Sequence, residues 1–282
     1  MKTKRSKRLQ PALVKSLLRL FAVLPMPVLH KIGGALGYPL LWIPNDLCRV
    51  ARVNIALCFP HLPEQERRRL LLQTLKESAR TALELGPLWF WPPERILGLI
   101  TKVTGRELLD DLLRQEGGVV LLIPHLGAWE MVTIYMSIHF AGQYPLTGLY
   151  RPPRMAELGE VMLQARRRFG AEFVPTTMAG VRRLYRTLDD GGVIGVLPDQ
   201  EPGVGKSIFA PFFGISASTM GLVSRLVSRT GARPIYTYIS RLPRGRGFEM
   251  HFLAAPTGIG DDDLATAAQR LNEGVENCIK RI

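Results

Sequence analysis

A short apolar run that ends in a histidine constrains this chain more than any other feature. Residues 119–123 are continuously apolar and mostly branched, which is typical of a strand buried on both faces of a parallel sheet. His125 follows that run, Gly127 permits a turn, and Glu130 stands in the first turn of a helix expected over 128–140. Ligands of open α/β sheets bind beyond the carboxyl ends of strands, so we expect a functional site at this turn.

The order of the expected elements predicts the fold class. From residue 100 onward strands alternate with helices, which is typical of an α/β fold with a central mixed, mostly parallel sheet flanked by helices. Residues 234–240 and 248–253 are expected to form an antiparallel hairpin at one edge. Further strands are expected over 146–150, 173–175 and 193–197, and helices over 64–85, 107–115, 155–168, 180–189, 219–229 and after the acidic cap 261–263.

The first 45 residues differ in character from the remainder. A basic head precedes an apolar stretch that charged residues and prolines interrupt before it reaches the roughly 20 residues of a membrane span. This pattern predicts an N-terminal amphipathic helical arm (1–45) that lies in the surface of an anionic membrane. The alternative is that the arm covers the core of the domain. Residues 46–282 are expected to form a single α/β domain, and no secretory signal is recognised.

The net charge and the cysteines limit which binding partners and which metal or disulfide sites we expect. The net charge of +13 favours acidic or phosphorylated partners such as nucleic acid, anionic lipid or an acidic carrier protein. No helix-turn-helix, zinc finger or aromatic sheet motif supports nucleic acid, so a non-enzymatic basic binding protein is the weakest interpretation. Three scattered cysteines, Cys48, Cys58 and Cys278, give neither a disulfide framework nor a metal-ligand spacing, and we expect no metal and no cofactor.

The residue types at the turn suggest proton transfer. A neutral imidazole at His125 is able to take a proton from a hydroxyl, and a carboxylate at Glu130 is able to hold its other ring nitrogen. Since the chain carries no Gly-x-Ser-x-Gly motif, we expect direct attack by a substrate hydroxyl without an acyl-enzyme. A hydrolase that uses the same pair on water is the alternative.

Other polar residues follow expected strands and helices toward the same edge of the sheet. Arg151 and Asp199–Gln200 come after strands, and Arg166 and Arg168 end a helix. Arginine at such an edge is suited to holding a phosphate or an oxyanion, although a basic helix end is also commonly just solvated. Residues 207–214 are expected to be an apolar loop, either lining an acyl-chain slot or plugging the core.

Taken together, these blocks resemble a known family. The segment His125-Leu-Gly-Ala-Trp-Glu130 resembles the H-x4-[D/E] signature of glycerolipid-type acyltransferases. It is closer to the H-x-G-x-W-E form of the late, or secondary, acyltransferases of lipid A biosynthesis (the lauroyl/myristoyl acyltransferase family). The similarity covers nearly the whole chain through further blocks in the same order: Arg52-Val-Asn54, Cys58-Phe-Pro60, Tyr150-Arg151-Pro152, Arg166 with Arg168, Leu197-Pro-Asp199-Gln200 and 209–214 with Ala217.

The resemblance implies an acyltransferase at the cytoplasmic face of the inner membrane. Such an enzyme moves a fatty acyl chain from acyl carrier protein to a hydroxyacyl group of a phosphorylated lipid A precursor. It implies His125 as general base, Glu130 as its partner, and Arg166 and Asp199 as residues that position substrate or stabilise charge. The substrate-binding residues would be Arg151, Arg168, Gln200, Phe209, Phe212 and Phe213.

Two departures from the family pattern leave the acceptor open. Ala128 stands where many members have Asn, and an aromatic and basic tail common in the family is absent after Ile282. A related acyltransferase that acts on another glycolipid or hydroxyacyl lipid is therefore an alternative. The sequence indicates neither the acyl chain length nor the oligomeric state.

Overall fold

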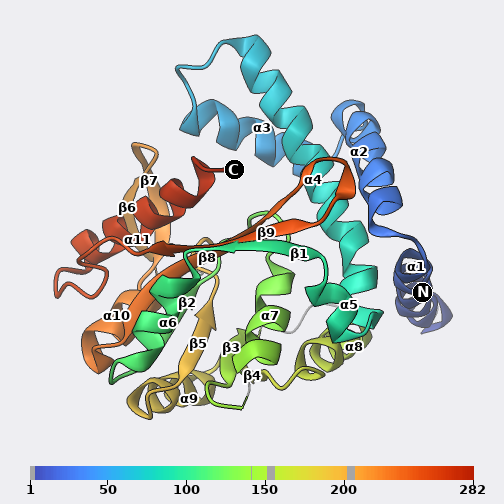
Figure 1. The fold of residues 1–282 in the computed structure, drawn as a ribbon. Helices are drawn as coiled ribbons and strands as arrows, with labels where there is room; N and C mark the ends of the chain where they lie inside the picture. The colour runs from blue at the N-terminus through green and yellow to red at the C-terminus, as the bar shows by residue number, and fades with distance from the viewer. Residues whose placement is uncertain (1–3, 141, 151–155, 202–206) are drawn as a thin grey trace.

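The computed structural model describes residues 4–140, 142–150, 156–201 and 207–282 (Figure 1). The helices in these ranges are α1 (Lys4–Val23), α2 (Met26–Trp42), α3 (Asp46–Cys58), α4 (Glu64–Phe90), α5 (Pro93–Leu97), α6 (Arg106–Arg114), α7 (Glu130–Phe140), α8 (Ala156–Arg167), α9 (Met178–Asp189), α10 (Leu222–Thr230), the 3-10 helix η1 (Pro243–Gly245) and α11 (Leu264–Ile279). The strands are β1 (Ile100–Thr104), β2 (Val119–Leu122), β3 (Leu146–Tyr150), β4 (Glu172–Pro175), β5 (Val193–Val196), β6 (Ser207–Phe212), β7 (Ile215–Met220), β8 (Arg233–Arg241) and β9 (Phe248–Ala254).

Seven of these strands form one mixed sheet. Their order is β1-β9-β8-β2-β5-β3-β4, and neighbouring strands are parallel throughout except for β8 and β9. The expected fold class, a mostly parallel sheet flanked by helices, is confirmed. The expected hairpin also forms, but it does not lie at the edge because β1, which the sequence analysis did not identify, pairs with the outer side of β9.

The two faces of the sheet pack against different helices (Figure 1). Val119 and Leu121 of β2 belong to one core, which contains side chains of α6 and α7. Val120 and Leu122 belong to a second core, which contains side chains of α9, α10 and α11. Successive residues of a strand point to opposite faces, so burial on both sides explains why 119–123 is apolar without alternation.

The N-terminal helices α1 and α2 pack on the long helix α4. On α2, Gly33 and Gly37 lie one turn apart, and a Cβ on Gly37 would come within 3.0 Å of the Cα of Lys76. Leu18 and Leu29 are buried in the first core. One side of this segment therefore covers the core, as the alternative interpretation of the arm expected.

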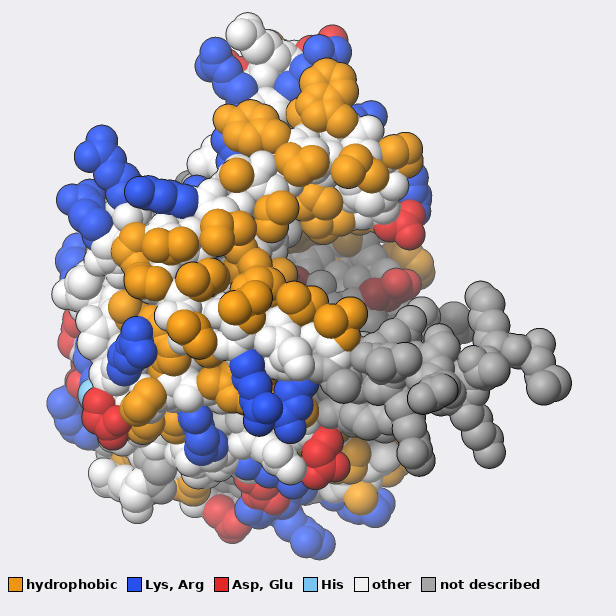
Figure 2. Space-filling view, turned by 90° about the vertical axis from the view of Figure 1, so that its right-hand side faces the viewer, with side chains coloured by type: hydrophobic (Ala, Val, Ile, Leu, Met, Phe, Trp, Pro, Cys, Tyr) orange, Lys and Arg blue, Asp and Glu red, His pale blue; other side chains and the backbone are white. Residues whose placement is uncertain are grey.

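The opposite side of α1 and α2 exposes apolar side chains. Figure 2 shows a broad hydrophobic region on this side of the molecule, with lysine and arginine side chains around it. The exposed apolar residues of α1 and α2 include Leu13, Leu17, Leu20, Val23, Val28, Ile32 and Leu36. In the described part of the chain, no helix combines the length and hydropathy needed to cross a bilayer.

Two expected element boundaries were wrong. The helix expected over 64–85 continues through Gly86 and Pro87 to Phe90, as α4. Gly86 serves close helix packing instead, because a Cβ there would lie 2.4 Å from the carbonyl oxygen of Leu18 on α1. Thr219 and Met220 belong to β7 and not to the following helix, which begins at Leu222.

The expected apolar loop over 207–214 is a β-hairpin. Strands β6 and β7 pair antiparallel from Ser207↔Met220 to Phe212↔Ile215. The two residues between them, Phe213 and Gly214, both have positive φ angles (49° and 78°), as a tight two-residue hairpin turn requires. Phenylalanine at the first turn position hid this hairpin, because asparagine or glycine is the usual signal there.

Candidate active site

Strand register brings His125 and Asp199 together. β2 and β5 are adjacent and parallel, and Leu122 is paired with Val196. His125 is the third residue after Leu122, and Asp199 is the third residue after Val196. Both side chains therefore leave the same edge of the sheet, beside each other and beyond the carboxyl ends of the strands.

The Asp199 carboxylate holds His125 at two points. Its Oδ1 lies 2.9 Å from Nδ1 of the imidazole, and its Oδ2 accepts a 2.9 Å hydrogen bond from the backbone N–H of His125. The side chains remain partly accessible, at 33% for His125 and 26% for Asp199. An aspartate on Nδ1 favours the tautomer that carries its proton there, which leaves Nε2 as a proton acceptor.

The second ring nitrogen of His125, Nε2, faces Gln200, the residue that follows Asp199. Nε2 of His125 lies 3.3 Å from the side-chain Nε2 of Gln200. An amide N–H at this place donates to the imidazole lone pair, and a substrate hydroxyl would occupy the same position when it gives up its proton. Gln200, expected among the substrate-binding residues, is thus brought into the site.

Glu130 is not the partner of His125, which corrects the expected pairing. It is the first residue of α7 and its carboxylate is bonded to Arg166, whose Nε donates to Oε2 at 3.0 Å and whose Nη2 donates to Oε1. Only 6% of the Glu130 side chain and 14% of the Arg166 side chain are exposed. The helix that starts at Glu130 turns the carboxylate toward α8, while the parallel register delivers Asp199 to the imidazole.

Trp129 connects the ion pair with the imidazole. Its ring lies edge-to-face against His125 with centroids 4.8 Å apart, and the Arg166 guanidinium carbon is 5.5 Å from the Trp129 ring centroid. The Glu130–Arg166 pair therefore fixes the aromatic wall of His125. This wall was not among the expected site residues, although Trp129 lies inside the motif.

Gly127 is required for the turn that aims His125. Its φ is +58°, and a Cβ would lie 1.8 Å from the carbonyl oxygen of Ile239 on β8. The neighbouring Ala128 N–H donates to that same oxygen at 2.9 Å. The expectation that glycine permits this turn is confirmed, and contact with the adjacent strand gives the reason.

A buried polar network behind the turn was not predicted. Arg241, at the end of β8, donates to the carbonyl oxygen of Gly127 at 3.2 Å and to both carboxylate oxygens of Glu84 on α4 at 2.6 Å. His30 of α2 lies 2.6 Å from the same carboxylate. Burial opposes ionisation of Glu84, but the Arg241 guanidinium and His30 outweigh it and lower the pKa of that carboxyl. The pairing of residues far apart in sequence left no local signal.

The remaining expected residues lie elsewhere or outside the described ranges. Arg168 donates to the carbonyl oxygen of Trp91 at 2.5 Å and lies against the Phe169 ring, so it holds the end of α4. Arg151 falls outside the described residues. Phe209 is exposed on β6, and Phe212 is half-buried against the second core. The Phe213 ring packs against the ring of Phe59, the residue after α3, with ring centroids 5.0 Å apart.

The cysteines are free thiols. Cys48 and Cys278 are buried and Cys58 is half-buried, as expected from their scatter. Burial raises the pKa of the Cys278 thiol to about 12, which leaves almost no thiolate at neutral pH. Cys278 is thus a poor nucleophile, and His125 and Asp199 are better placed for chemistry.

Comparison with known proteins decides the family. The sequence profile described as "Bacterial lipid A biosynthesis acyltransferase" matches residues 2–282. The chain belongs to this family. It is accordingly an acyltransferase that transfers groups other than aminoacyl groups, and the resemblance drawn from the motifs is confirmed.

Curated relatives cover most of the chain. It is 27% identical over 257 residues to the lipid A biosynthesis lauroyltransferase of Escherichia coli K12, which covers 91% of this chain and 82% of that protein. It is 30% identical over 264 residues to a lipid A biosynthesis acyltransferase of Haemophilus influenzae (92% and 81%). It is 28% identical over 277 residues to the palmitoleoyltransferase of E. coli K12 (93% and 83%).

Proposed function

We propose that this protein transfers a fatty acyl chain from acyl carrier protein to a hydroxyacyl group of a phosphorylated lipid A precursor, with His125 as general base. The observation that carries the proposal is the contact between His125 and Asp199 beyond the carboxyl ends of β2 and β5, in a chain of the lipid A acyltransferase family. The names of the relatives, which include lauroyl and palmitoleoyl transferases, support a fatty acyl donor.

The proposed reaction needs one base and no protein nucleophile. The hydroxyl oxygen of the acceptor attacks the thioester carbon while its proton passes to Nε2 of His125. Asp199, on Nδ1, stabilises the imidazolium that results. When the tetrahedral intermediate collapses, the C–S bond breaks, the carrier's thiolate leaves and the imidazolium returns the proton to it. The product is an acyloxyacyl ester.

The Glu130–Arg166 pair has a supporting role in this scheme. The Arg166 guanidinium and the Glu130 carboxylate are hydrogen-bonded to each other. Their role in catalysis is therefore to hold Trp129 against the His125 imidazole. A buried ion pair of this kind fixes one arrangement at little net gain in stability. Gln200 supplies an N–H beside Nε2, at the place that the acceptor hydroxyl takes in the reaction.

We place the enzyme at the cytoplasmic face of the inner membrane, lying on the bilayer through the outer side of α1 and α2. Exposed Leu17, Leu20 and Val23 supply apolar area. Exposed Lys15 and Arg19 supply the charge that attracts anionic headgroups. The net charge of +13 also suits an acidic carrier protein and a phosphorylated acceptor.

The His125→Ala variant tests the proposal. Purified protein is assayed for transfer of radiolabelled lauroyl groups from acyl carrier protein to a phosphorylated, hydroxyacylated glucosamine disaccharide. We expect transfer to fall by at least about 100-fold, within the range that a positioned base contributes. His139→Ala, in the last turn of α7, is the matched control and retains the wild-type rate. Turnover by His125→Ala at the wild-type rate contradicts the assignment.

A further inference from the structure

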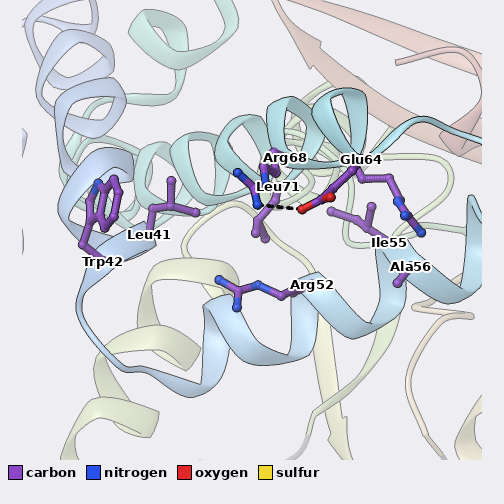
Figure 3. A pocket seen from close by; sticks show the side chains of 9 residues that line it. Leu41, Trp42, Arg52, Ile55, Ala56, Glu64, Arg68 and Leu71 are labelled. Carbon is purple, nitrogen blue, oxygen red and sulfur yellow. Dashed lines mark hydrogen bonds and ion pairs between the residues drawn. The ribbon is translucent and has the colours of Figure 1, made fainter.

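A cavity of about 560 Å³ lies between α2, α3 and α4 (Figure 3). Its size is within the range of small-molecule binding sites. No residue around it belongs to the His125 site. Thr81 of α4 lies 3.5 Å from the carbonyl oxygen of Gly127, and Leu71, which lines the cavity, precedes Thr81 by ten residues. At a rise of about 1.5 Å per residue, the cavity is about 15 Å along α4 from the catalytic turn.

Part of the cavity wall is apolar. Leu41 of α2, Ile55 of α3 and Leu71 of α4 face it from three sides, and Ile55 and Leu71 are otherwise buried. Trp42 stands at one end with 82% of its surface exposed (Figure 3). An exposed indole beside apolar walls is suited to a ligand that has a hydrocarbon part and reaches water at one end.

Arginines line the same space. Arg52 extends from α3 into the gap between α2, α3 and α4, and Arg68 reaches it from α4 (Figure 3). Arg68 is paired with Glu64 at 2.6 Å, whereas the contact of Arg52 is with the sulfur of Cys48 at 3.8 Å. In the described part of the chain, Arg52 and the half-buried Arg67 form no ion pair with a carboxylate. Glu64 also lines the cavity, but its carboxylate is paired with Arg68, so these two guanidinium groups have no ion-pair partner of their own.

We propose that this cavity binds the phosphate group of a membrane lipid, with Arg52 and Arg67 on the phosphate and the start of a hydrocarbon chain against Leu41 and Trp42. Guanidinium groups match phosphate oxygens in geometry and charge. Ile43, Leu47 and Val50, which follow Trp42 in the chain, are also exposed apolar residues. The ligand class is a phosphate-bearing lipid, supplied either by a bilayer phospholipid or by a phosphorylated glycolipid.

Binding is measured by calorimetry on the full chain in detergent, so its result does not depend on acyl transfer. The probes are dihexanoyl phosphatidylglycerol below its critical micelle concentration, dihexanoylglycerol, which lacks phosphate, and inorganic phosphate. An acylated, phosphorylated glucosamine disaccharide is added as competitor, and whichever lipid binds more tightly identifies the source. Saturable binding of a phosphate-bearing lipid is expected.

Matched variants locate the site. The double variant Arg52→Gln/Arg67→Gln should weaken binding of the phosphate-bearing lipid by about tenfold or more. The control Arg49→Gln/Arg69→Gln removes the same charge from exposed positions on α3 and α4 and should change affinity less than twofold. Equal weakening in both variants, equal affinity for dihexanoylglycerol or for inorganic phosphate, or no saturable lipid binding would overturn the proposal. Acyl transfer by the double variant is measured separately. Weakened lipid binding with wild-type transfer would support the lipid site and show that the His125 site works without it.

Discussion

Glu130 and Arg166 form a buried ion pair with two parallel hydrogen bonds. Glu130 is the first residue of α7, and Arg166 lies in the last turn of α8. The acid of the H-x4-E motif is thus engaged by an arginine 36 residues away, and the imidazole of the same motif is held by Asp199. The motif joins two pairs that meet at Trp129. We therefore expect the loss of Glu130 and the loss of His125 to have different effects.

Glu130→Gln should lower stability as well as activity. Removing one partner leaves the Arg166 charge nearly buried without compensation, which typically costs about 3–5 kcal/mol. The double variant Glu130→Gln/Arg166→Met removes both charges and should recover part of that loss. Urea unfolding followed by circular dichroism measures both. A double variant less stable than Glu130→Gln alone would contradict this account of the pair.

Gly127→Ala should abolish folding of the catalytic turn. The added Cβ meets the Ile239 carbonyl oxygen at 1.8 Å, and the positive φ is unfavourable for alanine. The matched control is Gly142→Ala, where a Cβ has no neighbour within 4 Å. We predict a clear drop in melting temperature and loss of transfer for the first variant only. Equal melting temperatures for the two variants would show that the turn tolerates the change.

Val23→Asp should weaken vesicle binding if the outer side of α1 and α2 lies on the membrane. A charge within the apolar contact opposes its burial and repels anionic headgroups. Met178→Asp is the control, since Met178 on α9 is 71% exposed and Val23 is 77% exposed. Cosedimentation with phosphatidylglycerol vesicles compares them. Similar losses for both variants would place the membrane contact elsewhere.

The stability of the wild-type protein should fall in acid partly through Glu84. Arg241 and His30 lower the pKa of this buried carboxyl below its ordinary value of 4.5. The stabilising contribution is therefore fully present above pH 4.5 and is lost as the pH falls below it. Glu84→Gln should be less stable at pH 6 and show a shallower decline of melting temperature between pH 5 and 3. The exposed Glu107→Gln should keep the wild-type slope; a wild-type slope in Glu84→Gln would contradict the linkage.

The sequence predicted the central strands of the sheet but missed the edge strand β1. Continuous apolar runs identified β2 and β5, because strands covered on both faces have no alternation. β1 was missed because its burial is incomplete and Lys102 lies within it. The helix expected over 64–85 was ended just before Gly86, since a glycine in a sequence does not distinguish a helix end from close packing against another helix.

The sequence singled out His125 and Asp199, which lie in contact, but the pairing it predicted for His125, with Glu130, was wrong. Proximity in sequence favoured Glu130 as the partner of His125, while the deciding factor was the register of β2 against β5. Equal spacing of His125 and Asp199 from the ends of two strands was a usable signal only with the strand order known. The Arg241–Glu84–His30 network, which joins three distant segments, had no such signal.

The most direct measurement of the central claim is a double-mutant cycle between His125 and Asp199 in kcat for acyl transfer. If Asp199 acts through the imidazole, His125→Ala and Asp199→Asn each lower kcat by at least about 100-fold, and the double variant is no slower than the slower single variant. Losses that multiply in the double variant, or a wild-type kcat for Asp199→Asn, would show that the two residues do not work as one unit.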